Sequence, residues 1–375
     1  MRKALGIIAV TLAAGCVFTA GCSSCNGNGK NVAPLASNWY TSTGYRNIQP
    51  TFTEGVTDKS EYKEIIDYDV NFKEPSVGNN TYSVKYENGN YHTEFYAVKF
   101  ADFANSDFVH EDHKAGYEDK KITAYYYYTL FTATVTYKYG STPSEPLPVN
   151  IETKCYFLSV EDELRPLYSK QVIKSPSPAA LQATSLSSCY SLFDEIYETF
   201  YSYNGNSAIT QITDNLNENN SRKVTRGVGG TSNSLFDVTS LDIVIRALVA
   251  SGLNQTIDLY TPLNSVKAFT LGSSSASIGT DDDKRLIAEK LQKKELYVPA
   301  EDEETVGDNL RTTAVTVTSN TELKGVSQTY WFAKVENKRN NTGRATLLKI
   351  SLPIVFNLGT LEYTIREVSS TLWNG

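Results

Sequence analysis

The chain has 375 residues, and its 42 aspartates and glutamates outnumber its 35 lysines and arginines, so the formal net charge is −7 with histidine neutral. An acidic protein repels the phosphate backbone, which argues against nucleic acid as a partner. No cofactor is expected, because the glycine-rich run 227–230 fits neither a P-loop nor a dinucleotide fingerprint and is typical of a linker.

The N-terminus has the pattern of an export signal. Arg2 and Lys3 are followed by a short apolar stretch, residues 4–18, which falls short of the roughly 20 residues that a membrane-spanning helix needs. The tripeptide Ala20-Gly21-Cys22 comes next and resembles the lipobox of bacterial lipoprotein precursors. The resemblance implies that residues 1–21 are a signal peptide and that lipidated Cys22 is the mature N-terminus.

Two alternatives to this assignment stay open. Ala14-Gly15-Cys16 forms a competing box, but Cys22 leaves a longer apolar region before it and a polar segment directly after it. The other alternative is an ordinary secretory signal whose cysteines are incidental. The lipoprotein resemblance implies an extracytoplasmic protein that paired acyl chains hold on the bacterial cell membrane.

Composition divides the rest of the chain into segments. Residues 22–39 are small and polar and predict a flexible tether. A β-rich lobe is expected over 40–175 and a second over 235–375, and the two can also form one single domain. The connecting region 176–234 is polar, and we expect loops at 175–178 and 204–234.

Alternation of apolar and polar residues predicts strands in the first half of the chain. Asn88-Gly89 lies between two such segments and predicts a two-residue hairpin. Phe131–Tyr139 is the clearest amphipathic strand, and we expect it to pair antiparallel with 149–157. Residues 192–203 fit either a helix or a strand.

The last third of the chain predicts a three-stranded meander over 330–336, 348–356 and 361–366. Pro353 cannot donate to a ladder, so we expect its strand to be at an edge or bulged. Helices are expected over 241–248, capped by Ser240, and over 283–294, exposed to solvent. The predicted fold is mainly β, with antiparallel sheets of long amphipathic strands, sandwich or half-barrel-like, and one or two helices.

Few residues indicate chemistry. His110 and His113, with His92 as a third ligand, could hold zinc, but their charged surroundings favour a solvated turn. Cys155 and Cys189 could form a disulfide, or Cys155 could be a plain buried thiol. No nucleophile can be tied to a histidine and an acid, so an enzyme is the least expected class.

The run Tyr125-Tyr-Tyr-Tyr128 is the most informative motif. Tyr126, Tyr128 and Leu130 lie on the face opposite to the expected core, and they predict an aromatic surface that binds a hydrophobic ligand or a glycan. The alternative is that another strand or the helix after Ser240 covers this face. The expected function is a non-catalytic binding module, with an envelope protein that docks a partner as the alternative and a hydrolase as the least expected.

Overall fold

The structure is a computed structural model, and it describes most of the chain beyond residue 62. The described residues are 63–76, 82–102, 106, 107, 109, 123–160, 163–179, 183–202, 207–227, 235–249, 255–261, 265–294, 296, 297, 299–319, 327–337 and 342–370. The segments of the expected signal peptide and tether, and His110 and His113, lie outside these residues.

Sixteen strands and two α-helices make up most of this described part of the chain. In chain order the strands are β1 (Lys63–Lys73), β2 (Tyr82–Lys99), β3 (Thr123–Tyr139), β4 (Thr142–Pro143), β5 (Leu147–Val160), β6 (Glu163–Pro178), β7 (Tyr190–Tyr201), β8 (Ser207–Asp214), β9 (Arg222–Gly227), β10 (Leu235–Asp237), β11 (Gln255–Thr261), β12 (Ser265–Ser275), β13 (Thr312–Ser319), β14 (Ser327–Asn337), β15 (Thr342–Pro353) and β16 (Thr360–Ser370). The helices are α3 (Leu241–Val249) and α4 (Asp281–Gln292), and the 3-10 turns are η5 (Phe100–Asp102), η6 (Leu186–Ser188), η7 (Glu218–Asn220), η8 (Val238–Ser240) and η9 (Val355–Asn357).

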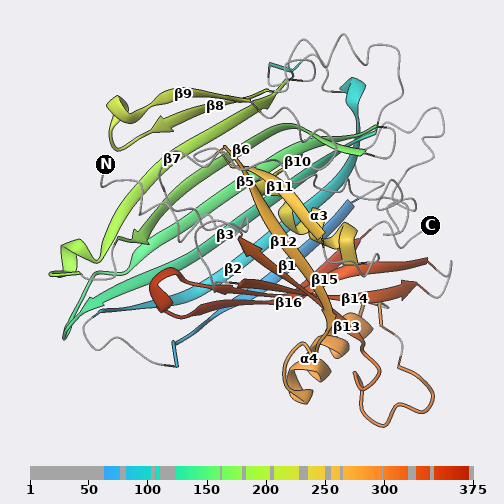
Figure 1. Cartoon of the computed structure of the whole chain (residues 1–375). Helices are drawn as coiled ribbons and strands as arrows, with labels where there is room; N and C mark the ends of the chain where they lie inside the picture. The colour runs from blue at the N-terminus through green and yellow to red at the C-terminus, as the bar shows by residue number, and fades with distance from the viewer. Residues whose placement is uncertain are drawn as a thin grey trace.

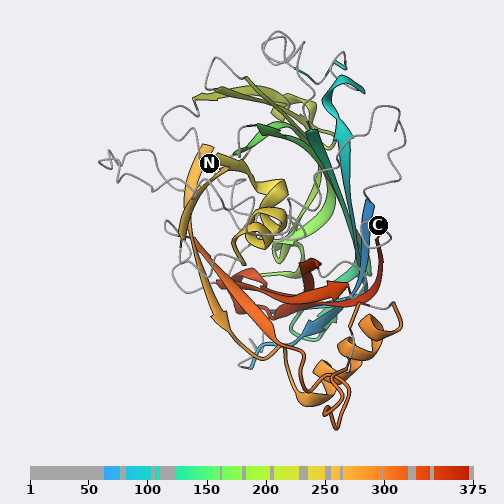
Figure 2. The same cartoon turned by 90° about the vertical axis from the view of Figure 1, so that its right-hand side faces the viewer.

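All sixteen described strands join one sheet, in the order β10-β11-β12-β13-β14-β15-β16-β1-β2-β3-β5-β6-β7-β8-β9, with β4 paired to β3. Neighbours are antiparallel except β10 and β11, which are parallel. The sheet curls so that α3 lies within it, while α4 lies outside (Figures 1 and 2). This arrangement confirms the prediction of a mainly β fold built from long antiparallel strands with two helices.

The hydrophobic core fills the inner face of the curled sheet. Every second residue of a strand points to the same face, and these inward positions carry large rings that are less than 2% exposed. The largest of them are Tyr68, Tyr91, Tyr125, Tyr137, Tyr260, Tyr363, Phe131 and Phe332. The buried stripe of α3, with Leu241, Val244 and Ile245, packs against this core as the sequence predicted.

Buried polar contacts hold α3 and β10 inside the sheet. Arg246 donates two hydrogen bonds to the carboxylate of Glu64 on β1, one of them at 2.9 Å. Asp237 at the end of β10 accepts hydrogen bonds from Ser169 at 2.6 Å and from Tyr201. The same carboxylate caps the turn before α3, so the prediction that Ser240 is the cap was wrong: its hydroxyl donates to the Asp237 carbonyl instead.

The expected hairpin at Asn88-Gly89 is a β-bulge inside the continuous strand β2. The register with β3 shifts between Glu87 and Asn90, and Asn88 adopts a left-handed φ of 54°. A Cβ at Gly89 would lie 2.6 Å from the carbonyl oxygen of Val70, so glycine is required by the close approach of β1. Asn-Gly therefore supplies the positive φ and the small residue of a bulge rather than of a turn.

The loops expected at 175–178 and 204–234 are another correction. β6 extends to Pro178, and β8 and β9 lie within the second segment. β8 buries one face, with Ala208, Thr210 and Ile212, and leaves polar residues on the other, whereas β9 is mostly exposed. Residues 192–203, which fitted two patterns, belong to the strand β7.

The other predicted elements agree with the structure, with two differences. β3 pairs with β5, and β14, β15 and β16 form the meander. Pro353 is neither in an edge strand nor in a bulge: it ends β15, beyond the last pair with β14 at Ser351. α4 is not wholly solvated, because it buries Ile287, Ala288 and Leu291. None of the helices in the described part combines the length and apolar character needed to cross a membrane.

Candidate ligand-binding surface on the outer face

Five aromatic side chains align across five neighbouring strands on the outer face of the sheet. Successive pairs are direct cross-strand partners in the β2–β3, β3–β5, β5–β6 and β6–β7 ladders. We call them the aromatic row: Tyr96, Tyr126, Tyr156, Tyr168 and Phe200. The row extends the prediction for Tyr126 to four further residues that the sequence reasoning missed.

Each ring of the aromatic row is close to the next one along the row. Their centroids are 5.8, 4.9, 6.5 and 5.3 Å apart in order along the row. The rings are tilted relative to one another, and most are half-buried, with Tyr168 the deepest at 4% exposure. Ring contacts of this kind stabilise a sheet and also present partly exposed faces to a ligand.

The helix α3 does not cover the aromatic row. Tyr127, the neighbour of Tyr126, points inward and donates its hydroxyl to Asp242 of α3. The alternation of the strand therefore places Tyr126 on the side away from α3. Of the two covers that the sequence left open, the helix after Ser240 is excluded.

One flank of the aromatic row is apolar and well packed. Tyr96, Tyr126 and Tyr156 pack against a small outer cluster. Its buried members are Val98, Phe100, Val109, Ala124, Leu158 and Leu167. This cluster packs against the three tyrosine rings from one side.

The opposite flank is polar. The positions two residues along each strand form a second aligned set, which we call the charged row: Glu94, Tyr128, Lys154, Lys170 and Glu198. Lys170 donates to Glu198 at 3.0 Å, and Tyr168 donates to the same carboxylate at 2.9 Å. Burial acts to raise the pKa of Glu198, but the hydrogen bonds from Lys170 and Tyr168 outweigh it and lower the pKa.

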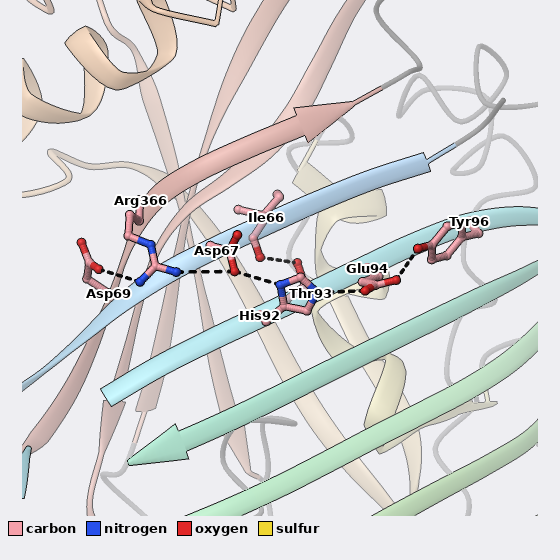
Figure 3. A network of polar contacts seen from close by, with 8 residues as sticks. All are labelled: Ile66, Asp67, Asp69, His92, Thr93, Glu94, Tyr96 and Arg366. Atoms are coloured by element: carbon pink, nitrogen blue, oxygen red, sulfur yellow. Dashed lines mark hydrogen bonds and ion pairs between the residues drawn. The ribbon is translucent and has the colours of Figure 1, made fainter. Parts of the chain in front are cut away.

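A polar network joins this flank to the neighbouring strands β1 and β16 (Figure 3). The Nδ1 atom of His92 forms a hydrogen bond of 2.8 Å with a carboxylate oxygen of Asp67. Its Nε2 atom forms one of 3.0 Å with a carboxylate oxygen of Glu94. Glu94 in turn accepts a hydrogen bond from Tyr96, the first ring of the aromatic row. Arg366 lies 3.6 Å from Asp67 and 3.3 Å from Asp69.

The network favours the charged form of His92. Partial burial acts to lower the pKa of His92, but the hydrogen bonds to Glu94 and Asp67 outweigh it, so the pKa is raised. An imidazolium that donates from both nitrogens has no lone pair for a metal. His92 therefore acts as a hydrogen-bond donor in the network. Among the described residues, no group of three or more histidine, cysteine, aspartate or glutamate side chains could hold a metal ion.

The two other residues predicted on this face take different places in it. Tyr128 belongs to the charged row, and its ring lies 6.3 Å from that of His92. Burial, followed by the charges of Glu152 and Glu94, raises the pKa of Tyr128. Leu130 lies two residues after Tyr128 on β3, further from the aromatic row, and its cross-strand partners are His92 and Glu152.

The expected disulfide is absent from the structure. Cys155 and Cys189 are both buried free thiols. Cys155 pairs with Ser169 on β6, whereas Cys189 lies beside the end of β6 near Pro178, about 30 Å further along at the usual rise of a strand. A disulfide needs Cα atoms within about 7 Å, so this pairing was wrong and the alternative of a buried Cys155 thiol holds.

Comparisons with known proteins add little to this geometry. No family model matches the chain, and no curated protein sequence matches it. The chain is similar to a solved structure described as a beta-barrel-like protein of domain of unknown function DUF1849 from Brucella abortus. The identity is 9%, the TM-score is 0.40, and the match covers 83% of this chain and 98% of that chain. A likeness of this degree carries no argument about function.

Proposed function

We propose that this protein is a lipid-anchored, extracytoplasmic lipoprotein that binds a glycan along the aromatic row without catalysing a reaction. The anchor rests on the lipobox resemblance ending at Cys22. The binding site rests on one observation, the five aligned rings of the aromatic row with a charged row beside them. Aromatic rings can stack on the C–H faces of sugar rings, and charged side chains can form hydrogen bonds with sugar hydroxyls.

A glycan fits this surface better than an acyl chain does. An acyl chain gains only from apolar contact and would have to desolvate the neighbouring charges Glu94, Lys154 and Glu198 without replacing their hydrogen bonds. Sugar hydroxyls can replace those bonds. The inner face, where a carrier of acyl chains would hold its cargo, is occupied by α3 and by buried rings such as Tyr91 and Tyr363.

Calorimetry with a panel of soluble oligosaccharides tests this proposal. The mature full-length protein in detergent is compared with the variant Tyr126→Ala/Tyr156→Ala and with the control Thr132→Ala/Thr134→Ala, which alters the same outer face at half-buried positions away from the row. Each lost ring contact contributes ~0.5–1.5 kcal/mol, so affinity should fall by about 5-fold to 150-fold in the tyrosine variant alone.

Circular dichroism and urea unfolding establish that both variants remain folded. Equal affinity in the two variants would contradict the site, and a protein that binds no oligosaccharide of the panel would contradict the ligand class. In that second case, stoichiometric lipid in native mass spectra of the protein purified from its own host would favour a hydrophobic ligand.

A further inference from the structure

The strand β9 is the outer edge of the sheet. It pairs with β8 from Ser207–Gly227 to Ile212–Arg222, and no described strand follows it in the sheet. In an antiparallel edge strand, alternate residues direct their N–H and C=O groups away from the sheet. The opposite edge, β10, has only three residues and is held inside by Asp237, so β9 is the edge that a further strand could reach.

The side chains of β9 are exposed and basic. Its sequence, Arg-Lys-Val-Thr-Arg-Gly, contains three cations and no acid, in a chain whose net charge is −7. Arg222 donates to the carbonyl of Asn220 at 3.0 Å, and within the described residues no carboxylate forms an ion pair with Arg222, Lys223 or Arg226. Glu195 is the carboxylate that interacts with Arg222 through space.

The charges decide which strand can be added. A second copy of β9 placed antiparallel beside the first would set cations opposite or diagonal to cations, which destabilises a strand pair. An extended segment with carboxylates at alternate positions has all of them on one face of the sheet, where they would lie beside Arg222 and Arg226. The same cations that prevent self-association of this edge therefore select an acidic partner.

We propose that β9 is a docking edge to which an extended, acidic segment of a partner protein is added as a further strand. Backbone hydrogen bonds supply the affinity, and Arg222 and Arg226, on one face of the strand, supply the preference for an acidic sequence. This inference goes beyond the proposed glycan site and does not depend on it, because the aromatic row ends at Phe200 on β7 and β8 lies between.

Fluorescence anisotropy with synthetic peptides tests the docking edge. The probe is a labelled ten-residue peptide of alternating threonine and glutamate, compared with its threonine and lysine counterpart. The full-length protein is compared with Lys223→Glu/Arg226→Glu and with the control Lys138→Glu/Arg311→Glu, which makes the same charge change at exposed residues elsewhere. Only the β9 variant should lose affinity for the acidic peptide, by about 10-fold or more.

Amide hydrogen exchange locates the bound peptide, and the acidic peptide should slow exchange in β9. Equal binding of the two peptides, equal loss in the two variants, or protection only outside β9 would overturn the proposal, as would the absence of binding. A dimer in sedimentation experiments that the β9 variant abolishes would also overturn it, because the occupant would then be a second copy of the chain.

Discussion

The polar network around His92 predicts a specific pH dependence of stability. His92 donates to Asp67 and Glu94, which are both on the outer face, and the three side chains are 23%, 25% and 26% exposed. The variant His92→Gln keeps a side chain that can form hydrogen bonds but removes the charge. We therefore expect the variant to be less stable than the natural protein at low pH and nearly as stable at high pH.

The magnitude follows from the two hydrogen bonds. A charge-assisted hydrogen bond contributes ~1.5–3 kcal/mol when buried, and partial exposure reduces this to ~0.5–1 kcal/mol, so the pair contributes about 1–2 kcal/mol. Because the pKa of His92 is raised in the folded protein, this stability is fully present below the unfolded pKa of about 6.5. It is lost as the pH rises from there through the raised folded pKa.

Several titratable groups surround His92 on the neighbouring strands and on α4. Asp67 and Asp69 are on β1, Arg366 is on β16 and Lys290 is on α4. Glu94 is on β2, Tyr128 is on β3, and Glu152 and Lys154 are on β5. Among these groups, His92 is the one whose raised pKa predicts a loss of stability as the pH rises through neutrality.

Urea unfolding from pH 5.5 to 8.5 measures the difference between the two proteins, and the NMR titration of the imidazole signals gives the pKa of His92 directly. The chain has only three histidines, and the signal missing in His92→Gln assigns the resonance. A stability difference that does not change with pH, or a folded pKa below 6.5, would refute this reasoning.

Three further predictions concern buried positions. Arg246→Met should lower the free energy of unfolding by about 3–5 kcal/mol, since it leaves the Glu64 carboxylate buried without its guanidinium, and Arg246→Met/Glu64→Leu should recover much of that loss in urea unfolding. Gly89→Ala should lower it by about 1–3 kcal/mol through the clash with β1, whereas Gly227→Ala, where an added Cβ meets nothing within 4 Å, should cost less than this. Burial raises the pKa of Asp242 to about 6, so stability should fall as the pH rises from 4 through 6, and Asp242→Asn should remove this dependence in pH-dependent melting curves.

Local patterns were sufficient for much of the fold. The alternation in Phe131–Tyr139 predicted which side chains are buried, and Phe131, Val135 and Tyr137 are 2% exposed or less. The same alternation placed Tyr126 on the outer face. Period-two patterning succeeds here because each strand has one face against the core and one against solvent.

Turn and loop chemistry was less informative. Asn88-Gly89 is suited both to a hairpin and to a bulge, and only the pairing of both halves of β2 with β3 distinguishes the two. The strands β8 and β9 were missed because polar residues and glycines dominate the segment that contains them, and they form as an extension of an existing sheet. Neighbouring strands, rather than their own composition, stabilise them.

The sequence by itself determined that the chain folds as antiparallel strands with a buried and an exposed face, and that Tyr126 lies on the exposed one. Only the tertiary structure decided that Tyr96, Tyr156, Tyr168 and Phe200 align with it, because cross-strand register depends on bulges and loops far apart in the chain. The meeting of His92 with Asp67, 25 residues away, has the same origin. Periodicity sets the face of each residue, whereas long-range pairing sets its neighbours.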